Sequence, residues 1–119
     1  MTTTGITWRF TVTAVGASSE DMENLLDAHT DALMDELLKL EECNPMIHDP
    51  SVGAELSTST IDILMLVNAP VDDAVKISRD VVRTAIHAAG GFTPAWDKGT
   101  VVPAHAAQYE PEATELMFA

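Results

Sequence analysis

The densest group of side chains with possible chemistry lies in residues 41–49, which read EECNPMIHD. They include three carboxylates, a histidine and the only cysteine of the chain, all potential metal ligands or catalytic groups. A structural zinc site, however, needs four Cys or His ligands in closely spaced pairs, and Cys43 and His48 do not form such a pair. The adjacent carboxylates also disfavour a reactive thiolate at Cys43. We therefore predict no metal site here and interpret the stretch as a connector, in which Asn44-Pro45 ends a helix and Asp49-Pro50 precedes a hairpin.

Four residues elsewhere are candidates for binding a small ligand. His29 falls within the apolar stripe of a predicted helix, where it acts either as a base or ligand or as a hydrogen-bonded core residue. Arg9 lies on the polar side of a predicted strand, and Trp8 and Trp96 are interpreted as core or lid aromatics. By contrast, we interpret His87 as a solvated residue at the end of a helix.

The chain lacks the short motifs of several enzyme classes. It has no G-x-x-x-x-G-K-[ST], no G-x-G-x-x-G and no G-x-S-x-G pattern, so nucleotide binding and acyl transfer through these motifs are not indicated. We therefore assign no catalytic residue and expect no cofactor.

The net charge of the chain is −13, from 19 acidic and 6 basic residues among 119. Such a charge repels phosphate backbones and anionic lipids, so we predict binding neither to nucleic acid nor to membrane. It indicates a well-solvated surface or a cationic protein partner. No apolar run approaches the roughly 20 residues that span a bilayer, and no secretory signal is recognised. Together with the single cysteine, these features predict a cytoplasmic protein.

Hydrophobic periodicity predicts most of the elements. Residues 6–14 alternate strictly between apolar and polar side chains, which indicates a strand. A long amphipathic helix follows from Ser18 or Ser19, with Asp27, Asp31 and Asp35 on its polar side. Residues 51–67 read as a hairpin with its turn between Ser57 and Thr60.

A second helix is predicted from Pro70 to the Gly90-Gly91 stop. Its exposed side carries Lys76, Arg79 and Arg83, which we expect to complement the aspartates of the first helix within one molecule or between molecules. A last strand is expected near residues 93–96 or 100–102, and residues 111–118 are expected to form a helical turn or two.

This order of elements predicts an α+β fold of the ferredoxin-like βαββα(β) type, with two helices on one face of an antiparallel sheet. Residues 1–104 are expected to form a single domain. Residues 105–119 are expected to be a C-terminal tail that docks on this domain or on a partner subunit.

The second face of the sheet predicts association. Leu64 and Leu66 point away from the helices in this arrangement, and apolar residues on such a face often mark an interface. We therefore expect a homodimer formed by packing of two open sheet faces, with Leu64, Leu66, Thr11 and Phe118 as interface residues.

The segments LMDELLKLEECNPMIHDPSVGAEL and RTAIHAAGGFTPAW resemble small uncharacterised α+β proteins encoded in actinobacterial genomes. The shared features are a helix rich in LMDELL, a strand entry of the form D-x-x-V at Asp49 to Val52, and a helix that ends in AIHAAGG. The resemblance covers residues 6–97 and implies no known activity.

Two functions are compatible with these features. The first is a non-enzymatic, acidic, homo-oligomeric domain that binds a protein or a small ligand. The alternative is a cofactor-independent enzyme of the dimeric α+β barrel type, similar to small monooxygenases or isomerases. This alternative requires a cavity between sheet and helices near His29 or Arg9, of about 300 Å³ or more.

Overall fold

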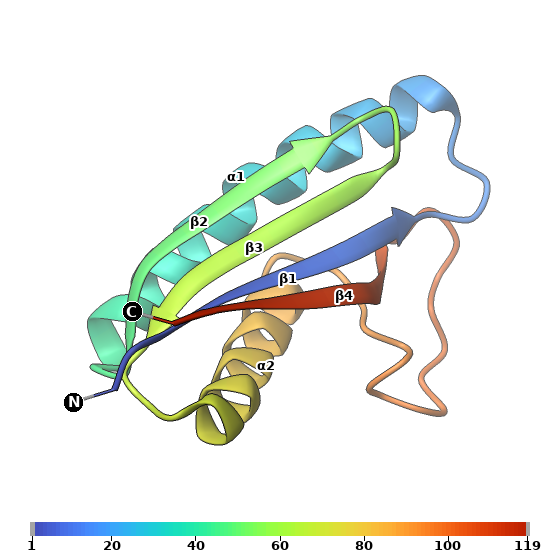
Figure 1. Ribbon diagram of the computed structural model, residues 1–119. Coiled ribbons are helices and arrows are strands. Elements are labelled where there is room, and N and C mark those ends of the chain that lie inside the picture. The colour runs from blue at the N-terminus through green and yellow to red at the C-terminus, as the bar shows by residue number, and fades with distance from the viewer. Residues whose placement is uncertain (1, 119) are drawn as a thin grey trace.

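A computed structural model describes residues 2–118, except for the side chain of Phe118. The elements are β1 (Thr4–Thr13), α1 (Ser19–Cys43), β2 (Ile47–Glu55), β3 (Thr60–Val67), α2 (Val71–Ala88) and β4 (Gln108–Phe118). The strands form one antiparallel sheet in the order β2-β3-β1-β4, and both helices cover the same face of it (Figure 1). The predicted α+β fold, with two helices and a four-stranded antiparallel sheet, is confirmed at this level.

The hydrophobic core lies between the sheet and the two helices. Alternate residues of the two central strands supply its sheet side, as the period-two pattern of β1 predicts. The helices supply the other side, and α2 does so through residues three and four positions apart. The largest fully buried side chains are Ile6, Phe10, Val12, Leu26, Leu33, Leu37, Ile47, Ile61, Ile63, Val67, Ile86 and Tyr109.

The predicted start of α1 is confirmed at the level of its cap. Ser18 is the N-cap, and its hydroxyl accepts a hydrogen bond from the backbone N–H of Asp21 at 3.1 Å. The Asp21 carboxylate in turn accepts from the N–H of Ser18 at 3.1 Å. This reciprocal pair satisfies two N–H groups that would otherwise have no partner in the helix.

The connector interpretation placed the whole stretch EECNPMIHD before the hairpin. In the structure, the last three residues of the stretch, from Ile47 to Asp49, already belong to the first strand of the hairpin. β2 begins at Ile47, so His48, Asp49 and Pro50 lie inside the strand, where the register with β3 shifts. Asp49 has a φ of 51° and donates its N–H to the Glu41 carboxylate at 2.8 Å. The irregularity accommodates Pro50, which has no N–H for the ladder. Glu41 thus ties the end of α1 to this bulge.

The last strand lies further along the chain than predicted. Residues 93–97 form a tight turn, and residues 108–118, the greater part of the predicted tail, form β4 instead of a helical turn. β4 pairs with β1 over its whole length, with a register shift opposite Arg9 and Phe10. This shift leaves Glu112 without a directly paired residue on β1. The alternation of side chains along β4 changes at that point, so a simple period-two pattern does not reveal the strand.

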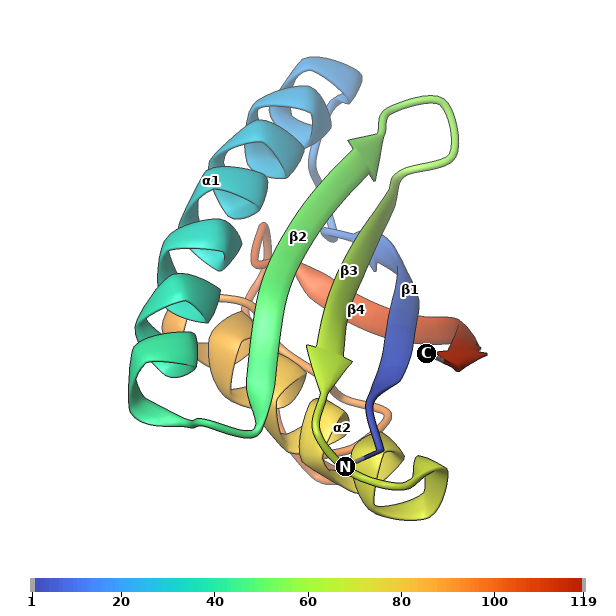
Figure 2. The same cartoon turned by 60° about the vertical axis from the view of Figure 1, so that its left-hand side comes forward.

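Both outer strands of the sheet are interrupted. β2 contains Pro50 and β4 contains Pro111, each beside a register shift. Proline and bulges on edge strands oppose the addition of a further strand. The open face, opposite the helices, remains as the broad surface of the sheet (Figure 2). Within residues 2–118, neither helix combines the length and the apolar character needed to cross a membrane.

Candidate functional site

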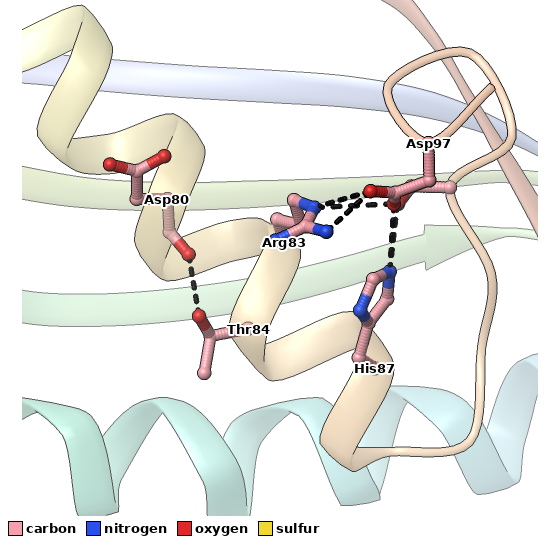
Figure 3. Close-up of polar contacts among 6 residues, drawn as sticks. Asp80, Arg83, Thr84, His87 and Asp97 are labelled. Atoms are coloured by element: carbon pink, nitrogen blue, oxygen red, sulfur yellow. Dashed lines mark hydrogen bonds and ion pairs between the residues drawn. The ribbon is translucent and has the colours of Figure 1, made fainter.

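Three polar residues form a stripe on the exposed face of α2. Arg79, Arg83 and His87 recur at intervals of four residues, which places them on one side of a helix. The helix ends at Ala88, and Gly90, with a φ of 90°, reverses the chain. The following segment then folds back beside the stripe and brings Asp97 to it (Figure 3).

Asp97 is the centre of a hydrogen-bonded network. The guanidinium of Arg83 holds both carboxylate oxygens, with Nε 3.0 Å from Oδ1 and 3.2 Å from Oδ2, and its Nη2 also contacts Oδ1. The hydroxyl of Thr93 donates to Oδ2 at 2.5 Å. Nε2 of His87 lies 3.2 Å from the same oxygen and 2.9 Å from the Thr93 hydroxyl.

The proton count in this network determines the tautomer of His87. Thr93 has one hydroxyl proton and donates it to Asp97, so it accepts from His87. Nε2 of His87 therefore carries a proton in this arrangement. Nδ1 has no hydrogen-bond partner among the described residues.

The same contacts explain the electrostatics of the pair. The hydrogen bond from Arg83, followed by that from Thr93, lowers the pKa of Asp97 to about 2. The hydrogen bond to Asp97 also raises the pKa of the Arg83 guanidinium. Both groups are therefore ionised at neutral pH, and their charges compensate each other.

Two hollows lie on either side of this ion pair. One has a volume of about 390 Å³, and its walls include His87, Gly91, Phe92 and Thr100. The other has a volume of about 480 Å³, and its walls include Arg79, Asp80, Ala95 and Trp96. Arg83 and Asp97 line both hollows. We call the two hollows together, with the ion pair between them, the α2 groove.

The α2 groove lies in the most basic part of the chain. Lys76, Arg79, Arg83 and Lys98 are four of the six basic residues, whereas only two of the 19 acidic residues, Asp80 and Asp97, fall in the same interval. The remaining sequence is strongly acidic. Residues 76–98 thus carry a net charge of +2, against −15 for the rest of the chain, so an anion is repelled less by this segment than by the rest.

The two predicted tryptophans lie together at this groove. Trp96 forms part of its wall, and its ring packs edge-on against Trp8 with centroids 5.5 Å apart. Trp8 itself is buried and donates its indole N–H to the Ser78 hydroxyl at 2.9 Å. Trp8 therefore supports the groove from the core side.

The other two predicted ligand residues, His29 and Arg9, lie outside the α2 groove and on opposite faces of the sheet. His29 lies on the buried side of α1, and its Nδ1 is 2.8 Å from the Tyr109 hydroxyl. Burial lowers the pKa of His29 and raises that of Tyr109. Arg9 lies on the open face, where it holds the carboxylate of Asp62 at 2.9 and 3.2 Å. The four residues therefore do not form one site.

In the described part of the chain, none of the hollows that we describe places a cavity of about 300 Å³ or more against His29 or Arg9. His29 lines neither hollow of the α2 groove nor the hollow on the open face, and a hollow of about 400 Å³ at the start of α1 reaches Met22 and Leu26 but not His29. The hollow beside Arg9 measures about 10 Å³. Neither volume nor lining favours a reaction chamber at either place.

Three of the four predicted interface residues, Leu64, Leu66 and Thr11, lie on the open face of the sheet. Leu64 is 37% exposed, and together with Leu66 and Met117 it surrounds a hollow of about 160 Å³. Thr11 lies on the same face, because it pairs with Thr60 and alternates with the buried β1 residues. The side chain of Phe118 lies outside the described part of the structure.

Sequence analysis missed Thr93, His87 and Asp97 as members of one site. The spacing along α2 indicates that Arg83 and His87 share a face, but no local pattern shows where the chain returns after Gly91. Within one molecule the predicted pairing of the two helices is not formed among the described residues: Arg83 pairs with Asp97, and none of the described ion pairs joins α1 to α2. Pairing of the two helices between molecules stays a prediction.

Comparison of the chain with models of protein families, with curated proteins and with solved structures finds no match in any of the three. The resemblance to small actinobacterial proteins therefore stays a prediction. Among residues 2–118, no three His, Cys, Asp or Glu side chains gather in a way that could hold a metal ion.

Proposed function

We propose that the protein is a binding module for a small anionic ligand, which it takes up in the α2 groove. The observation that carries this proposal is that Arg79 and Arg83 line two adjoining hollows, within a segment of the chain, residues 76–98, in which basic residues outnumber acidic ones. Because the rest of the chain is acidic and repels anions, the two arginines both attract the ligand and select the place where it binds.

The walls of the groove indicate the character of the ligand. Arg79 has no ion-pair partner among the described residues and is free to contact a negative group. Phe92 and Trp96 supply apolar and aromatic surface, one in each hollow. A small organic acid, with a charged end and an apolar body, matches this combination.

A thermal-shift titration at constant ionic strength tests the proposal. We expect acetate, benzoate or phosphate to raise the unfolding temperature beyond the effect of chloride. Arg79→Gln should weaken the binding by roughly tenfold, the effect of one lost charge-assisted hydrogen bond. Lys39→Gln is the matched control, since Lys39 is exposed on α1 and pairs there with Glu36. Equal responses to all four anions, or equal responses of the two variants, would argue against the proposal.

Homodimer formation through the open face is a second proposal for the same protein. The interrupted outer strands support it, because they oppose association by edge pairing and leave the face as the surface for a second copy. Leu64, Leu66 and Met117 supply apolar area on that face. A cationic protein is the competing occupant.

We also propose that the topology is ferredoxin-like. The order β4-β1-β3-β2, with one helix after β1 and another after β3, supports this assignment.

A further inference from the structure

We propose that the α2 groove binds its ligand by carboxylate exchange: the ligand carboxylate replaces that of Asp97 on Arg83, while His87 takes up a proton and pairs with Asp97. This inference rests on the proposed function, because it assumes that the groove is the binding site. It adds the chemical class of the ligand and a dependence of binding on pH.

The arrangement around Arg83 indicates a carboxylate ligand. Its guanidinium already contacts both oxygens of a carboxylate, that of Asp97, through Nε and Nη2. The planar guanidinium fits a second carboxylate in the same manner. Asp97 thus occupies the position that we assign to the ligand, and the two compete for Arg83.

Asp97 keeps other partners when Arg83 is withdrawn. The Thr93 hydroxyl donates to Oδ2 at 2.5 Å, and Nε2 of His87 lies 3.2 Å from that oxygen. The loss of Arg83 therefore leaves the carboxylate hydrogen-bonded but no longer compensated by a positive charge. The side chain of Asp97 is only 19% exposed, so water screens this charge incompletely.

Protonation of His87 restores the charge balance. Nε2 already carries a proton, so the incoming proton binds Nδ1, and the imidazolium then compensates Asp97. The charged groups that face His87 are Arg83 from α2 and Asp97 from the 93–97 turn. The residues that line the groove come from α2 and from residues 90–100, and none of them comes from α1.

The exchange has a measurable consequence. Each ligand that binds brings up to one proton with it, the proton that His87 takes up. The affinity then rises by up to about tenfold for each unit by which the pH falls. A carboxylate bound to Arg83 without the exchange would show no such proton uptake.

Calorimetric titration of the full chain with benzoate at pH 7.5, in buffers of different ionisation enthalpy, tests this inference. We expect proton uptake on binding, of up to one proton per benzoate. Asp97→Asn removes the competing carboxylate and should tighten binding by about tenfold, the effect of one charge-assisted hydrogen bond, while proton uptake disappears. His87→Gln should also abolish proton uptake and keeps the test usable if Asp97→Asn folds poorly. Lys39→Gln should behave as the wild type.

The outcomes separate this inference from the proposed function. Benzoate binding without proton uptake, and without tightening in Asp97→Asn, would overturn the exchange and leave the groove as an anion site. Binding of phosphate but not of benzoate would do the same. If neither the wild type nor Asp97→Asn binds benzoate, acetate or phosphate, both the exchange and the proposed function are overturned.

Discussion

Asp97 connects side chains from two segments of the chain. Arg83 and His87 come from α2, whereas Thr93 and Asp97 itself belong to the turn that follows it. The network therefore holds this turn against the helix in addition to lining the groove. A change in the ionisation of Asp97 should therefore alter both the packing of this turn on α2 and the binding of a ligand in the groove.

The low pKa of Asp97 implies that the free energy of unfolding falls in acid. The folded protein holds this carboxylate ionised down to about pH 2, whereas in the unfolded chain it titrates near its ordinary pKa of about 3.9. The unfolded state therefore binds more protons between these values, so the contribution of Asp97 to stability is complete above about pH 4 and is lost as the pH falls toward 2.

Thermal unfolding of the wild type and of Asp97→Asn between pH 6 and pH 2 measures this contribution. We expect the variant to be less stable at pH 6 and the two proteins to converge toward pH 2. Asp35→Asn is the control, because Asp35 is exposed on α1 and forms none of the described ion pairs. A difference between wild type and Asp97→Asn that stays constant with pH would contradict the account.

The candidate site could be predicted only in part from the sequence. Helical spacing places Arg79, Arg83 and His87 on one face of α2, and this face was recognised as basic. The position of Asp97 depends on the chain reversal after Gly90 and on packing of the 93–97 turn. These are tertiary contacts, and no periodic pattern encodes them.

At the scale of elements, the turn after α2 depends on a close contact with β4. Gly91 lies where a Cβ atom would come within 2.7 Å of Tyr109 Cε1 and 2.9 Å of Ile86 Cγ2. Tyr109 and Ile86 are both fully buried, so neither can move aside at little cost. The glycine is thus required by packing of β4 against the end of α2.

Gly91→Ala should destabilise the fold by about 1–3 kcal/mol, the usual cost of overpacking a core. Gly53→Ala is a matched substitution, because Gly53 lies on β2 with no atom within 4 Å of an added Cβ. We expect the second variant to unfold in denaturant at the wild-type midpoint or above it. Equal midpoints for the two variants would show that the contact with Tyr109 has no such role.

The elements with a regular pattern were predictable, and β4 was not. The alternation of β1 and the stripe of α2 are continuous, so their type and buried face follow from the sequence. β4 contains Pro111 and three glutamates, which do not favour a strand, and its bulge breaks the alternation. Pairing with β1 overrides these local preferences.

At the scale of the whole molecule, the proposed homodimer depends on the net charge and on the open face of the sheet. The net charge of −13 opposes the approach of two copies, and salt screens this repulsion. A homodimer held by Leu64, Leu66 and Met117 should therefore strengthen as the ionic strength rises. An assembly with a cationic protein should weaken under the same change.

Sedimentation equilibrium at micromolar concentration tests the homodimer. Leu64→Glu should convert the protein to a monomer while its circular dichroism stays unchanged, since Leu64 is partly exposed and lies outside the hydrophobic core. His48→Ala should remain dimeric, because His48 contacts Asn68 within the same chain. A wild-type protein that is monomeric at every salt concentration would remove the basis for this proposal.

The central claim is that the α2 groove is the ligand site, and an NMR titration of the isotope-labelled full chain with benzoate tests it most directly. The account predicts that shifts of the backbone amides concentrate in residues 79–100 and shrink strongly in Arg83→Gln but not in Lys39→Gln. Shifts centred instead on Leu64 and Leu66 of the open face, or no shifts with any of the three anions, would contradict it.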